Sequence, residues 1–387
     1  MKRKSPWKGG HSMRLLICAG GTGGGVYPAL NVLRELPEDD LELLWVGGDG
    51  GMEAELVKRE GIPFASIPAA GVHGVGLSRL PGNVISLVKG FFKAKQVLKR
   101  FQPDVLLFTG GYVAVPMALA AIRYPSLLFV PDIEPGLALK LISFFANLIA
   151  VPNADSLPYF PALIPHRKIN VTGYPVKPEL MQIDRISARK ALSLHDRKPV
   201  VLVFGGSKGA QTINRALLKL LPSLLQKYQI VHITGTTGWS EVQAQTASLS
   251  PESTTDYHLY AYLHEEMPAA LRAADLIVSR AGASILGEYP IIGTPAILVP
   301  YPYAWRYQKI NAEYLASRGA ARFLPDEQLA IQLEAMIDQL LNNPEEYRSM
   351  QQAMLSLRQP DAAAKIAQLL VTLGGEKTGT TGRENTV

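Results

Sequence analysis

Short apolar runs alternate with longer amphipathic stretches in the first half of the chain. The runs have the length of buried strands, and they cover residues 14–19, 41–48, 105–111, 126–132 and 148–153. The stretches between them place apolar residues at helical spacing. Strands that alternate with helices predict a parallel, doubly wound sheet with helices on both faces.

The same alternation begins again after residues 169–180, so the second half predicts another sheet of the same kind. A chain of 387 residues with 47% hydrophobic content is long enough for two cores. We therefore expect an α/β fold with two domains, at 13–173 and 199–372, joined by a linker at 174–198. The basic arm 1–12 and the polar tail 373–387 are expected to be disordered.

A glycine-rich loop follows the first strand of each half. "ICAGGTGGG" and "LVFGGSKGA" both place glycines between an apolar run and a helical pattern, about one domain length apart. One such loop is as well explained by a tight turn. Two matched loops favour binding of a diphosphate, because a helix N-terminus attracts anions and glycine lets them approach the backbone. Ligands of parallel sheets lie beyond the carboxyl ends of the strands, so we expect two domains that face across a cleft.

Charge and cysteine content exclude several classes of protein. The net charge is +6, but residues 1–12 contribute +4 of it, which leaves no basic surface typical of nucleic-acid binding. The single cysteine, Cys18, excludes an intrachain disulfide and fits a reducing compartment. No apolar stretch is long enough to span a bilayer, because Lys140 interrupts the best one, and the arm lacks a signal core. We expect a protein that is neither secreted nor membrane-spanning.

A nicotinamide dehydrogenase is the alternative that a glycine loop suggests first. Such an enzyme needs an acid about 20 residues past the loop to bind the ribose. The only acid near the end of the second run is Asp49, which comes later and lies in another glycine cluster. The sequence therefore disfavours this alternative.

Eight motifs give the chain a family resemblance from about Met13 to Leu370. They are "GGTGGGVYPA", "FTGGYVAVP", "PGLALK", "VTGYPVKP", "GGSKGAQTIN", "YLHEEMPAAL", "SRAGASILGE" and "YQKINAEYL". In this order they resemble the MurG family, which transfers N-acetylglucosamine from UDP-N-acetylglucosamine to undecaprenyl-diphospho-muramoyl pentapeptide. The resemblance implies a GT-B fold, with the donor on the C-terminal domain and the lipid acceptor on the N-terminal one. It also implies inverting transfer without a metal ion or other cofactor.

The resemblance assigns the donor site to residues of both glycine loops and of the second domain. Glu288 would accept both ribose hydroxyls, Ser207 would donate to the diphosphate, and the backbone of His264 would read the uracil. Lys177 stands where the family has arginine, so it keeps the charge but loses the bidentate fork. Without the resemblance, a helix glutamate or amide is more often a surface residue. The remaining donor candidates are Thr22, Gly23, Gly24, Ala283, Ser284, Ile285, Leu286, Gly287, Gln308 and Asn311.

The general base is the point at which this sequence departs from the family. The family loop ends in histidine, and Gly25 occupies that position here. Inverting transfer needs a group that removes the proton of the acceptor hydroxyl. Glu134 is our first candidate, although it is also explained as a turn residue before Pro135. The other candidates are Asp132 and His73, and the acceptor-binding candidates are Gly20, Gly21, Gly25 and Tyr112.

A basic amphipathic segment bears on the acceptor. No acid occurs between Glu60 and Asp104, whereas Arg79, Lys89, Lys93, Lys95, Lys99 and Arg100 lie there. A wide apolar stripe beside these charges predicts docking on the anionic inner surface of the cell membrane, although a solvated face is the simpler alternative. Two other functions remain: a related transferase with a different membrane lipid as acceptor, and a nucleotide-sugar-binding protein without activity.

Overall fold

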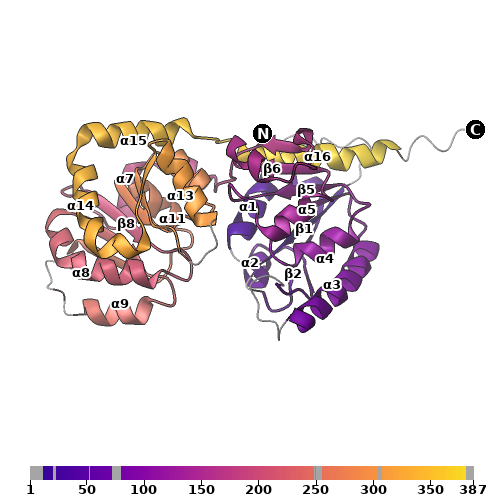
Figure 1. Ribbon diagram of the computed structural model, residues 1–387, viewed down its shortest axis with the longest axis horizontal. Helices are drawn as coiled ribbons and strands as arrows, with labels where there is room; N and C mark the ends of the chain where they lie inside the picture. The colour runs from indigo at the N-terminus through magenta and orange to yellow at the C-terminus, as the bar shows by residue number, and fades with distance from the viewer. Residues whose placement is uncertain are drawn as a thin grey trace, which may run out of the picture. The chain divides into compact units, whose positions relative to one another are not determined.

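The chain forms two compact units in the computed structural model (Figure 1). The first unit consists of Met1–Val176 and Pro360–Val387, and the second of Lys177–Gln359. The structure describes residues 12–20, 23–51, 53–71, 80–247, 249, 255–302 and 307–380.

A seven-stranded parallel sheet forms the centre of the first unit, in the order β3-β2-β1-β4-β5-β6-β7. The strands are β1 (Met13–Ala19), β2 (Leu41–Gly48), β3 (Phe64–Ile67), β4 (Val105–Gly110), β5 (Ser126–Phe129), β6 (Leu148–Val151) and β7 (Ile169–Val171). In register, Leu16 lies beside Leu44 on one side and Leu106 on the other. Such runs form central strands because both faces of the sheet are covered by helices.

Helices connect these strands and cover the sheet. They are α1 (Gly23–Leu33), α2 (Glu53–Arg59), α3 (Leu80–Phe101), α4 (Ala114–Ala120) and α5 (Leu137–Ser143), with short 3₁₀ turns at Glu38–Asp40, Ala154–Tyr159 and His166–Lys168. Helix α3 packs on α4, and α4 packs on α5, so these three form a row. The core beneath the row includes Leu98 of α3, Met117 of α4 and Ile142 of α5, all almost completely buried.

A six-stranded parallel sheet forms the centre of the second unit, in the order β10-β9-β8-β11-β12-β13. Its strands are β8 (Val200–Phe204), β9 (Gln229–Ile233), β10 (Tyr257–Tyr260), β11 (Leu276–Ser279), β12 (Ala296–Leu298) and β13 (Ala321–Phe323). The helices are α6 (Glu179–Gln182), α7 (Arg185–Ala191), α8 (Gln211–Lys227), α9 (Trp239–Thr246), α11 (Met267–Ala273), α12 (Ile285–Ile292), α13 (Tyr307–Ser317), α14 (Leu329–Asn342) and α15 (Pro344–Ser356), with a 3₁₀ turn at Asp326–Gln328.

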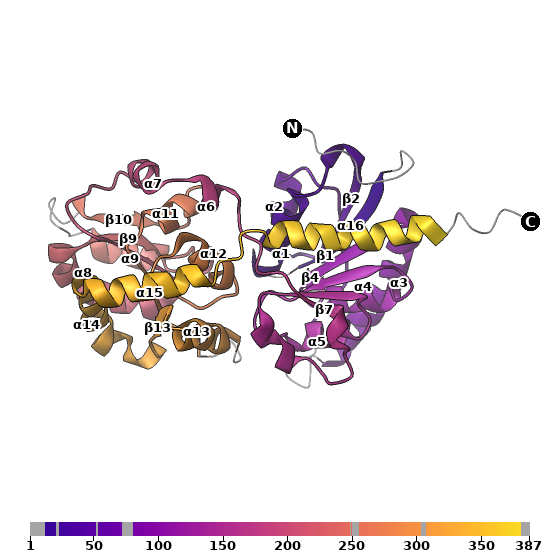
Figure 2. The ribbon, with the colours of Figure 1, turned by 90° about the horizontal axis from the view of Figure 1, so that it is seen from above.

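The last helix, α16 (Ala362–Thr380), belongs to the first unit (Figure 2). The sequence predicts a second domain that extends to residue 372 and a disordered tail at 373–387. Helix α16 instead contacts α1, β4 and β5, because its apolar residues Ile366, Leu370 and Leu373 are buried there. This packing continues the helix into the polar segment that composition alone suggested to be disordered.

The expected linker 174–198 is also divided differently. Helices α6 and α7 pack on α11 and form part of the second unit, which begins at Lys177. Arg189 of α7 is almost buried and contacts Asp275, at the start of β11, through a 2.7 Å ion pair. No helix in the described ranges is long and apolar enough to cross a membrane.

Candidate functional site

Each sheet has one point at which the strand order reverses. In the first sheet the chain moves from β1 toward β3 and then returns to place β4 on the other side of β1. In the second sheet the same reversal lies between β8 and β11. Loops that leave adjacent strands in opposite directions open a crevice at the carboxyl edge, which is where open α/β sheets bind ligands.

The first reversal point brings two glycine loops into contact. The amide of Gly20, after β1, donates to the carbonyl of Gly110 over 3.3 Å. Gly111 has a positive φ of +84°, and a Cβ there would lie only 2.6 Å from the carbonyl oxygen of Gly20. Glycine is therefore required at position 111 for both conformation and space.

Gly25 has a different environment. It is buried in the first turns of α1, and its carbonyl accepts a 2.6 Å hydrogen bond from the Thr109 hydroxyl. A Cβ at this position would lie 3.4 Å from the Thr109 carbonyl oxygen, which is an ordinary contact. Packing does not demand a glycine here, so the departure from the family histidine is not forced by the backbone.

The carboxylate of Glu134 is buried in an ion pair. Glu134 follows β5 at the carboxyl edge of the first sheet, and its side chain is 2% exposed. Lys140 of α5 donates to its Oε1 over 2.9 Å. As it stands, Glu134 stabilises the turn between β5 and α5. To act as a base, the buried carboxylate would have to come within hydrogen-bond distance of the acceptor hydroxyl.

The other candidates of the first unit differ in accessibility. Asp132 is half-buried in the same segment as Glu134, and Tyr112, after β4, is 53% exposed. Gly23 and Gly24 begin α1. Gly21, Thr22 and His73 lie outside the described residues.

A buried acid that sequence reasoning missed lies beside the first glycine loop. Glu53, the first residue of α2, is 2% exposed and accepts a 2.8 Å hydrogen bond from the amide of Gly48. A Cβ on Gly20 would approach Glu53 Oε1 to 2.8 Å, so Gly20 leaves room for this carboxyl group. Burial raises the pKa of the neighbouring Cys18 thiol, and the charge of Glu53 adds to the rise.

At the second reversal point, a titratable acid lies on α12. Glu288 is half-buried, and burial raises its pKa to about 7. A hydrogen bond from Ser284 and the charge of Lys177 act in the opposite direction. A carboxyl group that titrates near neutral pH is typical of functional sites, because structural carboxylates are usually held ionised by their partners.

Two further candidates join Glu288 from distant parts of the chain. Lys177, the first residue of the second unit, donates from its Nζ to the carbonyl oxygen of His264 over 3.4 Å. The His264 ring packs at 4.4 Å from that of Tyr262, measured between ring centroids. The structure thus brings Lys177, His264 and Glu288 together, whereas only their family motifs related them in the sequence.

Ser207 lies on the exposed loop between β8 and α8. The neighbouring glycines Gly206 and Gly209 have positive φ angles of +90° and +82°. These conformations are strained for residues with a side chain, so this loop needs its glycines. The loop leads into the N-terminus of α8, whose first amide groups and dipole favour an anion.

Two amide candidates are bonded to the backbone of their own unit. The Oε1 of Gln308 accepts from the Tyr301 amide over 2.9 Å. Asn311 is fully buried, and its Nδ2 donates to the Ala281 carbonyl over 3.2 Å. Both contacts tie α13 to loops at the carboxyl edge of the sheet. Ile285, Leu286 and Gly287 are also buried, whereas Ala283 and Ser284 are half-buried at the start of α12.

Arg280 is a site residue that sequence reasoning passed over, although it stands in the "SRAGASILGE" motif. It is 8% exposed and donates to Thr212 of α8 over 2.8 Å and to the Val299 carbonyl over 3.1 Å. It also forms an ion pair with Asp326. Arg280 therefore holds the loops after β11 and β12 against the start of α8.

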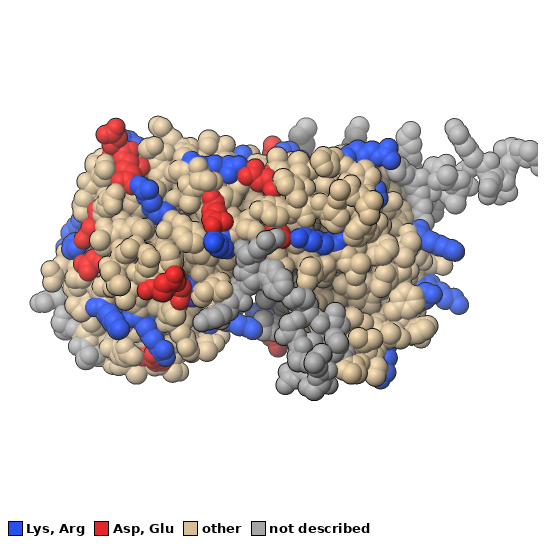
Figure 3. Space-filling view, in the orientation of Figure 1, with Lys and Arg blue, Asp and Glu red and all other residues tan. Residues whose placement is uncertain are grey.

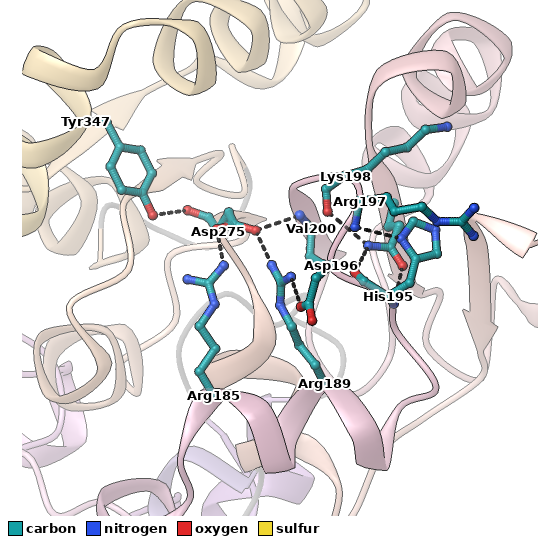
Figure 4. Close-up of polar contacts among 10 residues, drawn as sticks. Arg185, Arg189, His195, Asp196, Arg197, Lys198, Val200, Asp275 and Tyr347 are labelled. Atoms are coloured by element: carbon teal, nitrogen blue, oxygen red, sulfur yellow. Dashed lines mark hydrogen bonds and ion pairs between the residues drawn. The ribbon is translucent and has the colours of Figure 1, made fainter.

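A second charged cluster lies at the opposite, amino edge of the same sheet (Figure 4). Asp275 precedes β11 and accepts from Arg185, from Arg189 and from the amide of Val200, at the start of β8. Tyr347 of α15 donates to the Asp275 carbonyl over 2.9 Å. This cluster joins α7 and α15 to the sheet, and its position separates it from the candidate site. Within the described residues, no three His, Cys, Asp or Glu side chains are grouped as metal ligands.

Both halves of the chain match models of a known protein family. Residues 15–151 match the glycosyltransferase family 28 N-terminal domain, and residues 200–368 match the family 28 C-terminal domain. A UDP-N-acetylglucosamine--N-acetylmuramyl-(pentapeptide) pyrophosphoryl-undecaprenol N-acetylglucosamine transferase of Roseiflexus sp. (strain RS-1) is 41% identical, over 93% of this chain and 95% of its own. The transferase of the same name from Desulforudis audaxviator is 36% identical, over 95% and 100%.

Solved structures have the same architecture. The crystal structure of Acinetobacter baumannii MurG covers 93% of this chain and 99% of its own, with 26% identity and a TM-score of 0.70. A UDP-GlcNAc 2-epimerase from Neisseria meningitidis shares the fold, with 16% identity and a TM-score of 0.65. Two such parallel-sheet units with family 28 domains define a GT-B glycosyltransferase. The chain belongs to the MurG family of N-acetylglucosamine transferases.

Proposed function

We propose that the chain transfers N-acetylglucosamine from UDP-N-acetylglucosamine to the muramoyl-pentapeptide diphospho-undecaprenol lipid of peptidoglycan synthesis. The observation that carries this proposal is the 41% identity to a transferase of that name over 93% of the chain. The grouping of Glu288, Lys177 and His264 in the second unit supports it, because these residues can bind a nucleoside diphosphate.

The second unit binds the donor in this proposal. Glu288 accepts hydrogen bonds from the ribose hydroxyls, and the backbone at His264 reads the uracil. Ser207 and the N-terminus of α8 stabilise the diphosphate, both in the bound sugar nucleotide and as it departs. Lys177 donates to the His264 carbonyl and acts electrostatically on Glu288, and its ammonium group offsets negative charge of the diphosphate in this proposal.

The first unit binds the acceptor. A hydroxyl of the muramoyl lipid attacks the anomeric carbon of the donor sugar, its proton passes to a base, and UDP leaves with the electron pair of the broken bond. We propose Glu134 as that base, with Asp132 as the alternative on the same segment. Tyr112 is exposed at the same edge of the sheet and is proposed to contact the acceptor.

The row α3–α4–α5 is proposed to dock on the membrane that holds the lipid. Val84, Ile85, Val88 and Phe92 of α3 are between 47% and 60% exposed. Apolar side chains continue across the row, with Leu119 on α4 and Ile122 at its end, and Leu137 and Leu141 on α5 and Phe144 at its end. Exposed apolar patches of this extent mark interaction surfaces.

Positive charge accompanies these apolar side chains. Lys89, Lys93, Lys95 and Lys99 are exposed on α3. The sequence has no acidic residue between Glu60 and Asp104. Along the right-hand edge of Figure 3, near α3 in Figure 1, blue side chains stand out from tan ones without red beside them. An apolar face with basic residues fits an anionic lipid surface. We therefore propose a peripheral location at the cytoplasmic face of the cell membrane.

The experiment that tests the function is transfer from radiolabelled UDP-N-acetylglucosamine to the muramoyl-pentapeptide lipid. A lipid that lacks the peptide serves as the comparison. The expected result is label in the lipid fraction with the complete acceptor. Transfer only to another membrane lipid would show that the proposed acceptor is wrong. Donor binding without any transfer would favour a nucleotide-sugar-binding protein.

A further inference from the structure

A buried polar chain behind the second glycine loop has no part in the function described so far. His232 of β9 is completely buried, with its Nδ1 at 2.9 Å from the Tyr257 hydroxyl of β10. Its Nε2 lies 3.1 Å from the Oδ1 of Asn214, the fourth residue of α8. The Nδ2 of Asn214 donates to the Thr234 carbonyl over 3.0 Å. Asn214 and Thr234 are also buried.

The donors in this chain can be assigned from its last member. A carbonyl oxygen only accepts, so the amide nitrogen of Asn214 must face Thr234, and its amide oxygen must face His232. Nε2 of His232 therefore carries a hydrogen, and Nδ1 accepts from the Tyr257 hydroxyl. Burial lowers the pKa of His232 to about 3, which keeps the ring neutral. Every hydrogen bond then points from Tyr257 toward Thr234.

The chain of hydrogen bonds from Tyr257 to Thr234 ends at the glycine loop that carries Ser207. A Cβ on Gly209 would overlap the Thr234 carbonyl oxygen, and a Cβ on Gly235 would overlap the Gly209 nitrogen. Both glycines have positive φ, of +82° and +76°. The turn after β9 therefore lies directly against the loop after β8, so the position of the Thr234 carbonyl fixes the space open to Gly209.

We propose that Asn214, His232 and Tyr257 are positioning residues for the donor diphosphate. Their hydrogen bonds hold the Thr234–Gly235 turn against Gly209, and this contact sets the conformation of the Gly205–Gly209 loop. The inference rests on the proposed function in one respect, namely that this loop binds the diphosphate of the donor. The three side chains touch neither donor nor acceptor and act only through the backbone.

The test compares ligands that differ only in the diphosphate. Asn214→Asp keeps an acceptor for His232 but turns a carboxylate oxygen toward the Thr234 carbonyl. His232→Leu removes the donor to Asn214, whereas His232→Gln can supply an amide nitrogen in its place. Affinities for UDP and for uridine are measured by calorimetry, or by competition where binding is weak. Uridine reports the nucleoside site without the glycine loop.

We expect Asn214→Asp and His232→Leu to weaken UDP binding by about tenfold, which corresponds to the loss of one hydrogen bond. Uridine affinity should stay the same, and His232→Gln should recover most of the UDP affinity. Tyr228→Phe is the control, because it removes a buried hydroxyl bonded to Asp338 at the far end of α8. It should lower the unfolding temperature and leave both affinities unchanged.

Equal loss of UDP and uridine binding would overturn the inference, as would unchanged UDP binding in both folded variants. If Asn214→Asp and His232→Leu fail to fold, Tyr257→Phe provides a milder variant, because it removes only one hydroxyl. Equal loss of UDP and uridine binding, or unchanged UDP binding, in Tyr257→Phe would likewise overturn the inference. If the wild-type chain binds UDP no better than uridine, the proposed donor site is wrong, and that result is separate from the behaviour of the variants.

Discussion

The two reversal points share one topology but differ in the chemistry at their carboxyl edges. At the first, between β1 and β4, the described loops meet through glycine backbone, and the nearby acids Glu53 and Glu134 are buried. At the second, between β8 and β11, Ser207 is exposed and Glu288 is half-buried near Lys177. The same strand–glycine–helix pattern therefore yields a glycine-built surface in one unit and a polar, charged site in the other.

This difference explains why two similar loops can serve different ligands. A helix N-terminus contributes only about 0.3–1 kcal/mol to anion binding, so neighbouring charges decide the outcome. Near the second site, the ammonium group of Lys177 favours an anion. This positive charge supports the proposal that the nucleoside diphosphate binds in the second unit.

The largest effect is expected from Glu134 in the first unit. Glu134→Gln preserves the shape of the side chain but cannot accept a proton, so turnover should fall by about 10²–10⁴-fold. Donor affinity should not change, because the proposed donor site lies in the second unit. Turnover is measured as the initial rate at saturating donor and lipid, and donor affinity is measured as UDP binding by calorimetry. Normal turnover would falsify the assignment, and Asp132→Asn would then be tested in the same assay.

Reversal of charge on α3 addresses the membrane surface. Lys93, Lys95 and Lys99 changed together to glutamate should weaken binding to anionic vesicles by about 1 kcal/mol per neutralised charge. UDP affinity should be unaffected. Lys58 and Arg59 of α2, which lies away from the α3–α4–α5 row in Figures 1 and 2, provide the control reversal. Unchanged vesicle sedimentation at low salt would identify the basic segment as a solvated face.

Removal of the half-buried acid tests the second unit. Glu288→Ala should weaken UDP-N-acetylglucosamine binding by about 1.5–3 kcal/mol, as expected for hydrogen bonds to a charged group. The matched control is Glu334→Ala, because Glu334 of α14 is also half-buried and pairs with Lys227. Calorimetry on the folded variants measures both affinities. Equal affinity in wild type and Glu288→Ala would remove Glu288 from the donor site.

The raised pKa of Glu288 predicts a pH dependence of donor binding. With a pKa of about 7 in the free protein, Glu288 becomes protonated below neutral pH and loses the ability to accept two hydroxyls. UDP-N-acetylglucosamine affinity should therefore fall about tenfold from pH 8 to pH 6. The diphosphate diester itself does not titrate in this range. Glu288→Gln should show a flat profile, and a wild-type profile that is equally flat would contradict the prediction.

The smallest effect is expected at Gly25. Gly25→Ala places a Cβ in ordinary contact within a helix, so the free energy of unfolding should stay the same or rise by up to about 1 kcal/mol. Gly111→Ala, with a positive φ and a Cβ at 2.6 Å from the Gly20 carbonyl oxygen, should be clearly destabilising. Urea titration of the two variants measures the contrast. A large loss of stability in Gly25→Ala would show that this glycine is structural after all.

Much of the fold was predictable because the buried central strands are continuous apolar runs in the sequence. The five runs named in the first half correspond to β1, β2, β4, β5 and β6, and the alternation in the second half corresponds to β8, β9, β11 and β12. Strands β3, β7, β10 and β13, which lie at the edges of the two sheets, were missed. An edge strand is only partly buried, so its sequence is not a continuous apolar run.

The site was predictable only as a set of candidates. Family motifs pointed to Glu288, Lys177 and His264, and the fold brings them together. The same motifs gave no sign that Asn311 is bonded to the Ala281 carbonyl or that Glu134 is paired with Lys140. Hydrogen-bond partners of a polar side chain depend on which loops meet at the sheet edge, and local sequence does not encode that.

The sequence by itself determined two parallel-sheet domains, two glycine loops and the family. These features depend on local patterns: apolar runs form strands, helical spacing forms helices, and glycine permits close approach of the backbone. Tertiary structure alone decided that α16 joins the first unit, that Glu53 lies beside Gly20, and that a hydrogen-bond chain from Tyr257 reaches Thr234. Each of these joins residues far apart in the chain, and only the packing of helices on a sheet brings such residues within contact distance.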